Sequence, residues 1–427
     1  MTVEPVRAGS SLHRLGVVCG LCAGAWLGAA EAPTKLVTIG ISPFVITLGM
    51  VMGVFVARWT LPMMLKGSGY VFSDLRQKPH LIVWAVIAGM LWAVANTLTV
   101  FAVRNVGLSI AFPLWNTNSL VGLFWGWLFF KELRGSGAKG WFKVLGGTAA
   151  ILLGASVLAY ATTQQSAYTS GKATLGILAA LTAGLLWGTM YIPYRKAYIS
   201  GMNPLSFVTI FTFGELGATL ALGGIFEHGL GNLFHEFSAT RPVLFWLFLG
   251  GFCWVIGDLF QQYAAKYVGI GRGIPLSNTN QLWGLAWGAL VFGEFAGLST
   301  FARELVTGGS LLMIAGAVAI ATAVAPASEL ASWKLAMERE CSRYALNKQQ
   351  VEAAMRGEED QNAQKNGRRW WDVLVLLAAV GIFIALAWGT HGRSIELNLP
   401  WMLVLLAATT VCLVIGGTLL WRRTKFS

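Results

Sequence analysis

Charged residues are scarce in this chain. Only 12% of its 427 residues are Asp, Glu, Lys or Arg, whereas 56% are hydrophobic. A water-soluble protein could not cover so much apolar surface with so few charges. The composition therefore argues against a soluble enzyme or binding domain, and it predicts that most of the chain is embedded in a lipid bilayer.

The residue patterns of enzyme and metal sites are also missing. The five His are scattered, and Cys19 and Cys22, which share one face of the first predicted span, are expected to pack against a neighbouring helix rather than to bind a metal. There is no Gly-rich phosphate loop and no nucleophile elbow. Five Cys are too few, and odd in number, for a disulfide framework. We therefore expect no catalysis, no cofactor and no metal.

Long hydrophobic runs are abundant. Runs of about 18 or more apolar residues, which is enough for a helix to cross a bilayer, recur along the chain. We place twelve spans near residues 13–31, 41–59, 81–101, 109–130, 144–162, 173–192, 204–224, 243–262, 273–292, 304–323, 371–389 and 400–421.

The first half of the chain recurs about 160 residues later, which is the mark of an internal repeat. Residues 107–132 correspond without a gap to residues 269–294, and further matches extend the repeat to 12–160 and 172–323. Each copy holds five spans, an odd number, so the second copy must enter the membrane from the opposite side. The pattern predicts an all-α polytopic membrane protein: a ten-helix inverted repeat (5+5) plus two appended C-terminal transmembrane helices.

The rest of the chain falls into two segments. Residues 324–369 carry many charges of both signs, with apolar residues at roughly helical spacing, which predicts a cytoplasmic amphipathic helix and a linker. Residues 370–427 predict a two-helix transmembrane hairpin.

The net charge of +12 indicates membrane orientation rather than nucleic-acid binding. Lys and Arg concentrate in alternate loops, as they do on the cytoplasmic side of membrane proteins. This interpretation places both termini in the cytoplasm of a multi-pass protein of the cell membrane. The cations assigned to the cytoplasmic loops and end are Arg58, Lys66, Arg76, Lys78, Lys131, Arg134, Lys139, Lys143, Arg195, Lys196, Lys266, Arg272, Arg422, Arg423 and Lys425.

Glu215 and Asp258 are carboxylates that lie well inside predicted spans, away from the span ends. A charged side chain in a span costs about 2.5–3.5 kcal/mol on insertion scales, so each is a candidate functional residue. Asp258 shares one helix stripe with Trp254 and Gln261, at i, i+4 and i+7.

The first repeat carries a similar, uncharged stripe that begins with Trp92 and Asn96. Aromatic faces beside amide or carboxylate groups suit a sugar, which presents apolar C–H faces and hydroxyls. The alternative is an interhelical hydrogen-bond stripe with no ligand.

Each repeat also contains a proline followed by Asn-Thr-Asn. Pro113 and Pro275 each remove a backbone donor, so we expect helix kinks that face protein or a water-filled cavity. On a continuous helix, residues 116 and 118 are roughly 200° apart, so the triplet should not all face one cavity. The candidate substrate-binding residues are Trp92, Asn96, Asn116, Trp254, Asp258, Gln261, Asn278 and Gln281.

The stretch from Gly251 to Glu294 resembles the signature of the glucose/ribose porter family, near the rhamnose-transporter branch of the drug/metabolite transporter superfamily. The resemblance covers roughly residues 12–323 and implies a ten-helix inverted repeat that takes up a sugar, with protons. Asp258 stands where that family often has Asn or Gln, and the last two spans lie outside its pattern.

These observations predict a secondary transporter that moves a monosaccharide by alternating access, with the sugar, the bilayer and a proton as partners and no nucleic acid. A buried carboxylate loses hydration when charged, so Asp258 could take and release a proton, with Glu215 as the next candidate. Two alternatives stay open: a transporter of another small polar metabolite, and a non-transporting membrane sensor on the same scaffold.

Overall fold

The computed structural model describes residues 4–34, 40–106, 111, 114–163, 170–293, 299–358, 367–390 and 397–427. All regular secondary structure in these ranges is helical, which confirms the all-α prediction. Ten of the described helices are long and apolar enough to cross a membrane. The chain is therefore a multi-pass membrane protein.

The first half contains α1 (Glu4–Thr34), α2 (Pro43–Leu65), α3 (Ser68–Gln77), α4 (His80–Val106), α6 (Asn118–Phe130), α7 (Gly137–Trp141) and α8 (Gly147–Thr163), the last two joined by a π-helical turn at Phe142–Gly146. The second half contains α9 (Ser170–Ile199), α10 (Pro204–Phe226), α11 (Leu230–Ala239), α12 (Leu244–Val268), α13 (Ile270–Ser277), α14 (Asn280–Ala286), a π-helical turn at Trp287–Val291, and α15 (Thr300–Ala321). The C-terminal part contains α16 (Ala327–Tyr344), α17 (Lys348–Met355), α19 (Trp370–Trp388) and α20 (Leu399–Thr424).

Two of the twelve predicted spans are not continuous helices. Span 109–130 is interrupted by a turn at Asn116 and Thr117, just before α6, and span 273–292 is divided between α13 and α14. The breaks fall at the Asn-Thr-Asn triplets, where Thr117 and Thr279 turn their hydroxyls back onto the carbonyls of Leu114 (2.6 Å) and Leu276 (2.8 Å). Such local bonds compete with the helical ladder. Pro275 lies inside α13, whereas Pro113 lies outside the described residues.

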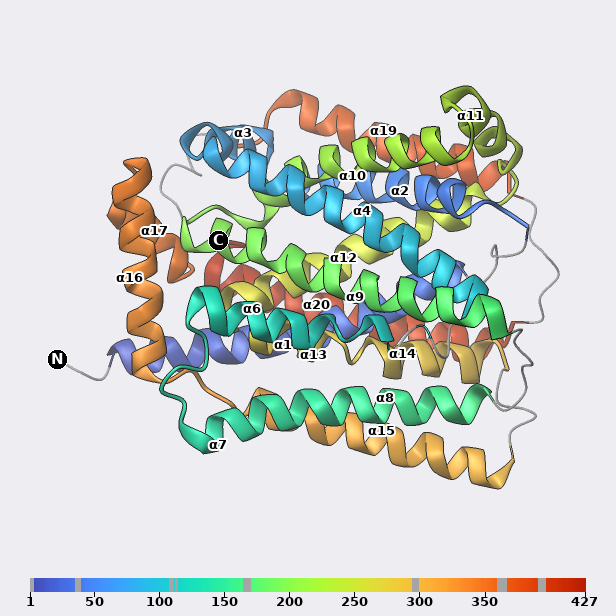
Figure 1. The fold of residues 1–427 in the computed structure, drawn as a ribbon. Helices are drawn as coiled ribbons and strands as arrows, with labels where there is room; N and C mark the ends of the chain where they lie inside the picture. Colours follow the sequence, from blue (N-terminus) through green and yellow to red (C-terminus); the bar gives the residue numbers. More distant parts are fainter. Residues whose placement is uncertain are drawn as a thin grey trace.

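The two halves interlock through pairs of equivalent contacts. α1 packs along α12, and α9 packs along α4 in the same way but runs in the opposite direction to α1 (Figure 1). A side chain at Gly16 would meet Val268, and one at Gly176 would meet Val106, in each case within 2.8 Å. Small residues at these crossings let the helix backbones touch. The repeated contacts reveal the inverted repeat in three dimensions.

The four helices α2, α4, α10 and α12 cross one another at the centre of the bundle. Gly89 of α4 lies against the Phe211 carbonyl of α10, and Gly251 of α12 lies against the Met50 carbonyl of α2. These approaches bring α2 and α10 close to the stripes on α4 and α12. The candidate residues therefore meet at the interface between the halves.

The remaining helices surround this core. α16 and α17 form a hairpin at one end of the bundle, near α3, while α11 lies at the other end (Figure 1). We call these the α16 end and the α11 end. α19 packs against α2, and α20 packs against α1. Only 11% and 22% of their most apolar windows are buried, which suits helices that face lipid.

Candidate substrate and proton site

A cluster of three charged side chains lies at the centre of the bundle. Arg58 of α2 donates from Nη2 to Asp258 Oδ2 of α12 at 2.6 Å, and its Nη1 lies 3.3 Å from Glu215 Oε1 of α10. All three side chains are completely buried. One cation thus faces two carboxylates in a region that water does not reach.

The placement of Arg58 corrects the sequence analysis, which assigned it to a cytoplasmic loop. Arg58 falls at the end of the predicted span 41–59, but α2 continues to Leu65, so Arg58 lies within the helix and not in a loop. Arg195, Lys266 and Arg272, also assigned to loops, are buried as well. The apolar residues that follow Arg58 for more than one further turn could have indicated that the helix continues. The two partners of Arg58 could not be inferred in this way, because they lie about 160 and 200 residues further along the chain.

The two carboxylates have different surroundings. Asp258 also accepts a hydrogen bond from Gln262 Nε2 at 2.8 Å and one from the Tyr194 hydroxyl at 3.5 Å. The Glu215 oxygens have no hydrogen-bond partner, and their contact is the longer ion pair with Arg58. The donors around Asp258 stabilise its charged form, whereas Glu215 depends on a shared arginine alone.

Aromatic rings border this cluster. Trp92 and Trp254 meet edge to face, with ring centroids 4.9 Å apart, so the two predicted stripes do come together. The Arg58 guanidinium lies 4.0 Å from the ring centroid of Phe211 and 5.4 Å from that of Trp254. The indole N–H of Trp92 and the amide N–H₂ of Asn96 are buried and have no hydrogen-bond partner. Unsatisfied donors of this kind are rare in native proteins and suit a polar ligand.

The Asn-Thr-Asn triplets also meet at the interface. The Asn278 amide nitrogen lies within hydrogen-bonding distance of the Asn116 carbonyl (3.2 Å), Asn118 Oδ1 (3.1 Å) and Ser119 Oγ (2.5 Å). Asn116 takes part through its backbone carbonyl and Asn118 through its side chain. The contact is therefore compatible with the expectation that the side chains of the triplet do not all face one cavity.

The other amides in the predicted set have mixed surroundings. Gln261 donates to Ser277 Oγ at 2.6 Å, which ties α12 to α13. The side-chain nitrogens of Asn116 and Gln281 are buried without a partner. Gln261 therefore has a structural contact, whereas Asn116 and Gln281 retain free donors.

A second charged network lies at the α16 end. Arg272 forms a bidentate salt bridge with Glu329 of α16, in which its Nη1 and Nη2 lie 2.7 and 2.8 Å from the two carboxylate oxygens. Arg195 Nε lies 3.3 Å from Glu132 Oε1. Glu132 accepts from the backbone N–H groups of Ile270 (3.1 Å) and Gly271 (2.8 Å), at the start of α13. Burial raises the pKa of the Glu132 carboxyl, and Arg195 opposes that effect. Together with the ion pair between Lys196 and Glu340, at 3.1 Å, these contacts attach α16 to the core.

The fold defines the class of this protein: a polytopic, inverted-repeat membrane protein with buried charges at the interface between its halves. Comparison with protein families matches residues 174–322 to the EamA-like transporter family. Residues 174–322 are thus similar to EamA-like transporters, which agrees with the resemblance to the drug/metabolite transporter superfamily seen in the sequence.

Curated relatives carry names that concern sugars. The chain is 27% identical to the glucose uptake protein GlcU of Staphylococcus xylosus over 232 residues, which cover 52% of this chain and 71% of that protein. It is 32% identical over 145 residues to a protein of Streptococcus pyogenes serotype M1 whose assigned name describes sugar uptake. That match covers 33% of this chain and 43% of the relative. The chain is therefore similar, at low identity and over part of its length, to proteins named for sugar uptake.

Proposed function

We propose that this protein takes up a monosaccharide across the cytoplasmic membrane by alternating access, coupled to protons. The observation that carries the proposal is the contact between Trp92 and Trp254 beside the buried Arg58, Asp258 and Glu215. The names of the relatives supply the substrate class, and the site chemistry agrees with it. A tryptophan face packs on the C–H face of a sugar ring, while amides and carboxylates bind its hydroxyls.

The architecture supports alternating access. Residues 12–160 and 172–323 form the two proposed repeats, residues 324–369 the proposed cytoplasmic segment, and residues 370–427 the appended hairpin. The central cluster is buried between the two repeats. Rocking one repeat against the other would open this cluster to each side in turn.

Charge balance supports coupling to a proton. If all three central groups are ionised, one positive charge faces two negative ones, and a negative charge remains uncompensated in the membrane. A proton on either carboxylate removes this imbalance. The sequence ranked Asp258 first, but the donors around Asp258 favour its ionised form. We therefore assign the transported proton to Glu215, with Asp258 as the fixed counterion of Arg58.

Sugar and proton would be linked through Arg58. When Glu215 is protonated, Arg58 interacts with Asp258 alone, and the Glu215 hydroxyl becomes a hydrogen-bond donor. When Glu215 loses the proton, it competes for Arg58 and only accepts hydrogen bonds. A sugar that binds one of these arrangements better must shift the protonation equilibrium, by reciprocal linkage.

Uptake into proteoliposomes tests the proposal. Purified protein is reconstituted and loaded with a buffer more alkaline than the outside, and radiolabelled monosaccharides are offered one at a time. We expect one or a few sugars to accumulate above the equilibrium level, and a protonophore to abolish this accumulation. Accumulation of a different polar metabolite would favour the first alternative. Saturable binding without movement across the membrane would favour a sensor.

A further inference from the structure

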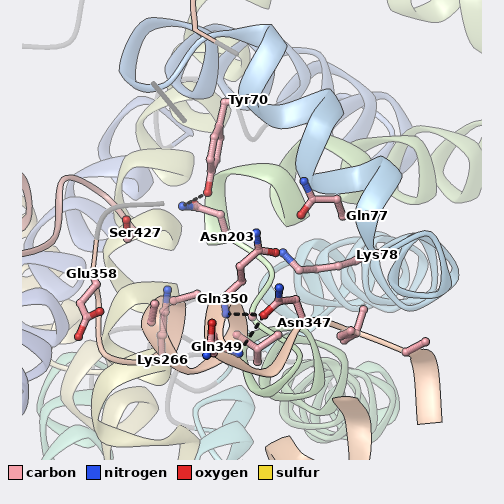
Figure 2. A pocket seen from close by; sticks show the side chains of 16 residues that line it. Tyr70, Gln77, Lys78, Asn203, Lys266, Asn347, Gln349, Gln350, Glu358 and Ser427 are labelled. Atoms are coloured by element: carbon pink, nitrogen blue, oxygen red, sulfur yellow. Dashed lines mark hydrogen bonds between the residues drawn. The ribbon is translucent and has the colours of Figure 1, made fainter. Parts of the chain in front are cut away.

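A polar cavity lies at the α16 end, apart from the central cluster. It has a volume of about 520 Å³ and lies between α3, the α9–α10 turn, the end of α12 and the α16–α17 hairpin (Figure 2). Its size falls within the range of small-molecule sites. The lining that matters here is Lys78, Asn203, Lys266, Asn347, Gln350 and Ser427.

The buried side of this cavity has a cation without a partner. Lys266 is only 6% exposed, and its ammonium group has no hydrogen-bond acceptor among the described residues. The ammonium group faces the ring of Tyr267, whose centroid lies 5.6 Å from Nζ. A buried ammonium without an acceptor is strongly unfavourable, so the arrangement suits an anionic ligand.

The acidic side chains near Lys266 are bound directly to other groups. Asp74 is ion-paired with Lys78 and also accepts a hydrogen bond from the Asn203 backbone N–H at 2.9 Å. Glu358, at the rim, pairs with Arg356 at 3.3 Å. The Ser427 hydroxyl is buried and has no partner either, so a second polar group is available beside the lysine.

The outer rim of the cavity is made of amides. Gln77 comes from the end of α3, while Asn347, Gln349 and Gln350 come from the start of α17, and all four are exposed. Figure 2 shows Lys266 and Ser427 on the other side of Asn203 from Lys78 and Gln77. Amides both donate and accept, so they suit hydroxyl groups. The combination of one buried cation and an amide rim matches a polyol that carries a phosphate.

We propose that this cavity binds a small phosphorylated polyol, with the phosphate against Lys266 and the hydroxyls against the amides of α17. A phosphate offers several acceptor oxygens, which can meet the ammonium group and the Ser427 hydroxyl together. The bound molecule would join α17 to α12 at a point eight residues, or about 12 Å, from Asp258. The phosphorylated group could belong to a free sugar phosphate or to a lipid headgroup.

Binding to the full-length purified protein tests this inference. Thermal unfolding and calorimetric titration are carried out in neutral-lipid nanodiscs with glucose 6-phosphate, inorganic phosphate and glucose. A second set of nanodiscs contains phosphatidylinositol 4-phosphate and no soluble ligand. We expect glucose 6-phosphate or the phosphoinositide to bind and to stabilise the protein. Lys266→Met should weaken this binding by about tenfold or more, because the variant loses a charged hydrogen bond.

Matched variants separate the site from general charge effects. Lys334→Met removes an exposed lysine from α16 outside the cavity and should leave binding unchanged. Gln350→Ala, at the rim, should weaken the binding of glucose 6-phosphate more than the binding of inorganic phosphate. If only glucose 6-phosphate stabilises the protein in a Lys266-dependent way, the cavity is a metabolite site. If only the phosphoinositide does so, the cavity is a lipid-headgroup site. Equal binding by wild type and Lys266→Met, or no binding of either probe, would overturn the proposal. Because the readout is binding, the result does not depend on whether the protein transports sugar.

Discussion

Arg58 and Asp258 are 200 residues apart in the sequence, yet they form a 2.6 Å ion pair in the centre of the bundle. Both side chains are fully buried. Removing one member of such a pair leaves the other as an uncompensated charge, which costs more than the pair itself contributes. This contact joins α2 of the first half to α12 of the second and sets the charge balance of the proposed site.

Loss of Arg58 should destabilise the whole protein. Arg58→Met leaves Asp258 and Glu215 buried without a cation, at a cost of about 3–5 kcal/mol. We expect a clear fall in the thermal unfolding midpoint of the detergent-purified protein. The double variant with Asp258→Asn should regain part of the loss. A single variant as stable as wild type would show that Arg58 is not needed to compensate these carboxylates.

Glu215→Gln should uncouple transport from the pH gradient. The amide keeps the shape of the protonated acid but cannot release a proton. We expect sugar exchange across proteoliposomes to persist, while accumulation driven by an alkaline interior disappears.

Glu236→Gln, an exposed change on α11, is the control and should behave as wild type. Asp258→Asn serves as the comparison. If Glu215→Gln still concentrates sugar and Asp258→Asn does not, Asp258 carries the proton.

Trp92→Phe should weaken sugar affinity without preventing insertion. The smaller ring keeps most of the packing but loses the buried, unpartnered indole N–H that we assign to the sugar. One hydrogen bond is worth about 1 kcal/mol, so half-saturation should rise about fivefold. Trp388→Phe, at a position 89% exposed on α19, should leave half-saturation unchanged. If both variants reach half-saturation at the same sugar concentration, Trp92 does not contribute to the binding site.

The close crossing of α12 and α2 at Gly251 should leave no room for a side chain. A Cβ there would collide with the Met50 carbonyl of α2, whereas a Cβ at Gly308 of α15 has open space around it. Both glycines are helical, so Gly→Ala gains similar helix propensity at each. We expect Gly251→Ala to lower the thermal midpoint and Gly308→Ala to leave it unchanged or raise it. The reverse order would contradict the close contact of α12 with α2.

The proposed orientation places the α16 end in the cytoplasm. Cysteines introduced at Lys139, at the α16 end, and at Arg241, near the α11 end, lie at exposed positions. A thiol reagent that cannot cross membranes should label Arg241→Cys in intact cells, and Lys139→Cys only after permeabilisation. Labelling of Lys139→Cys in intact cells would reverse the topology.

Much of the fold was predictable because it depends on local patterns. The length of the apolar runs predicts helices that cross a bilayer, and the repeat with its odd number of spans predicts two inverted halves. The spacing of Trp254, Asp258 and Gln261 placed them on one face of α12. Such inferences need only the geometry of a single helix or a comparison of the chain with itself.

The Asn-Thr-Asn triplets show where local patterns mislead. The sequence predicted a continuous helix through each triplet, so Asn116 and Asn118 were expected on opposite faces. In the structure, the chain turns at Thr117 and Thr279, and Asn278 contacts the backbone carbonyl of Asn116 and the side chain of Asn118. A threonine hydroxyl that bonds to a nearby carbonyl is compatible with a helix or with a break, and packing against the other half decides between them.

The sequence alone determined that this chain has carboxylates and tryptophans on helix faces within the membrane. Only the tertiary structure decided their partners: Arg58 for Asp258 and Glu215, and Trp92 for Trp254. The spacing of residues along a helix determines the face on which a side chain lies, because the helical repeat is constant. It contains no information about which distant helix packs against that face, and in a low-dielectric interior that neighbour decides whether a charge is compensated.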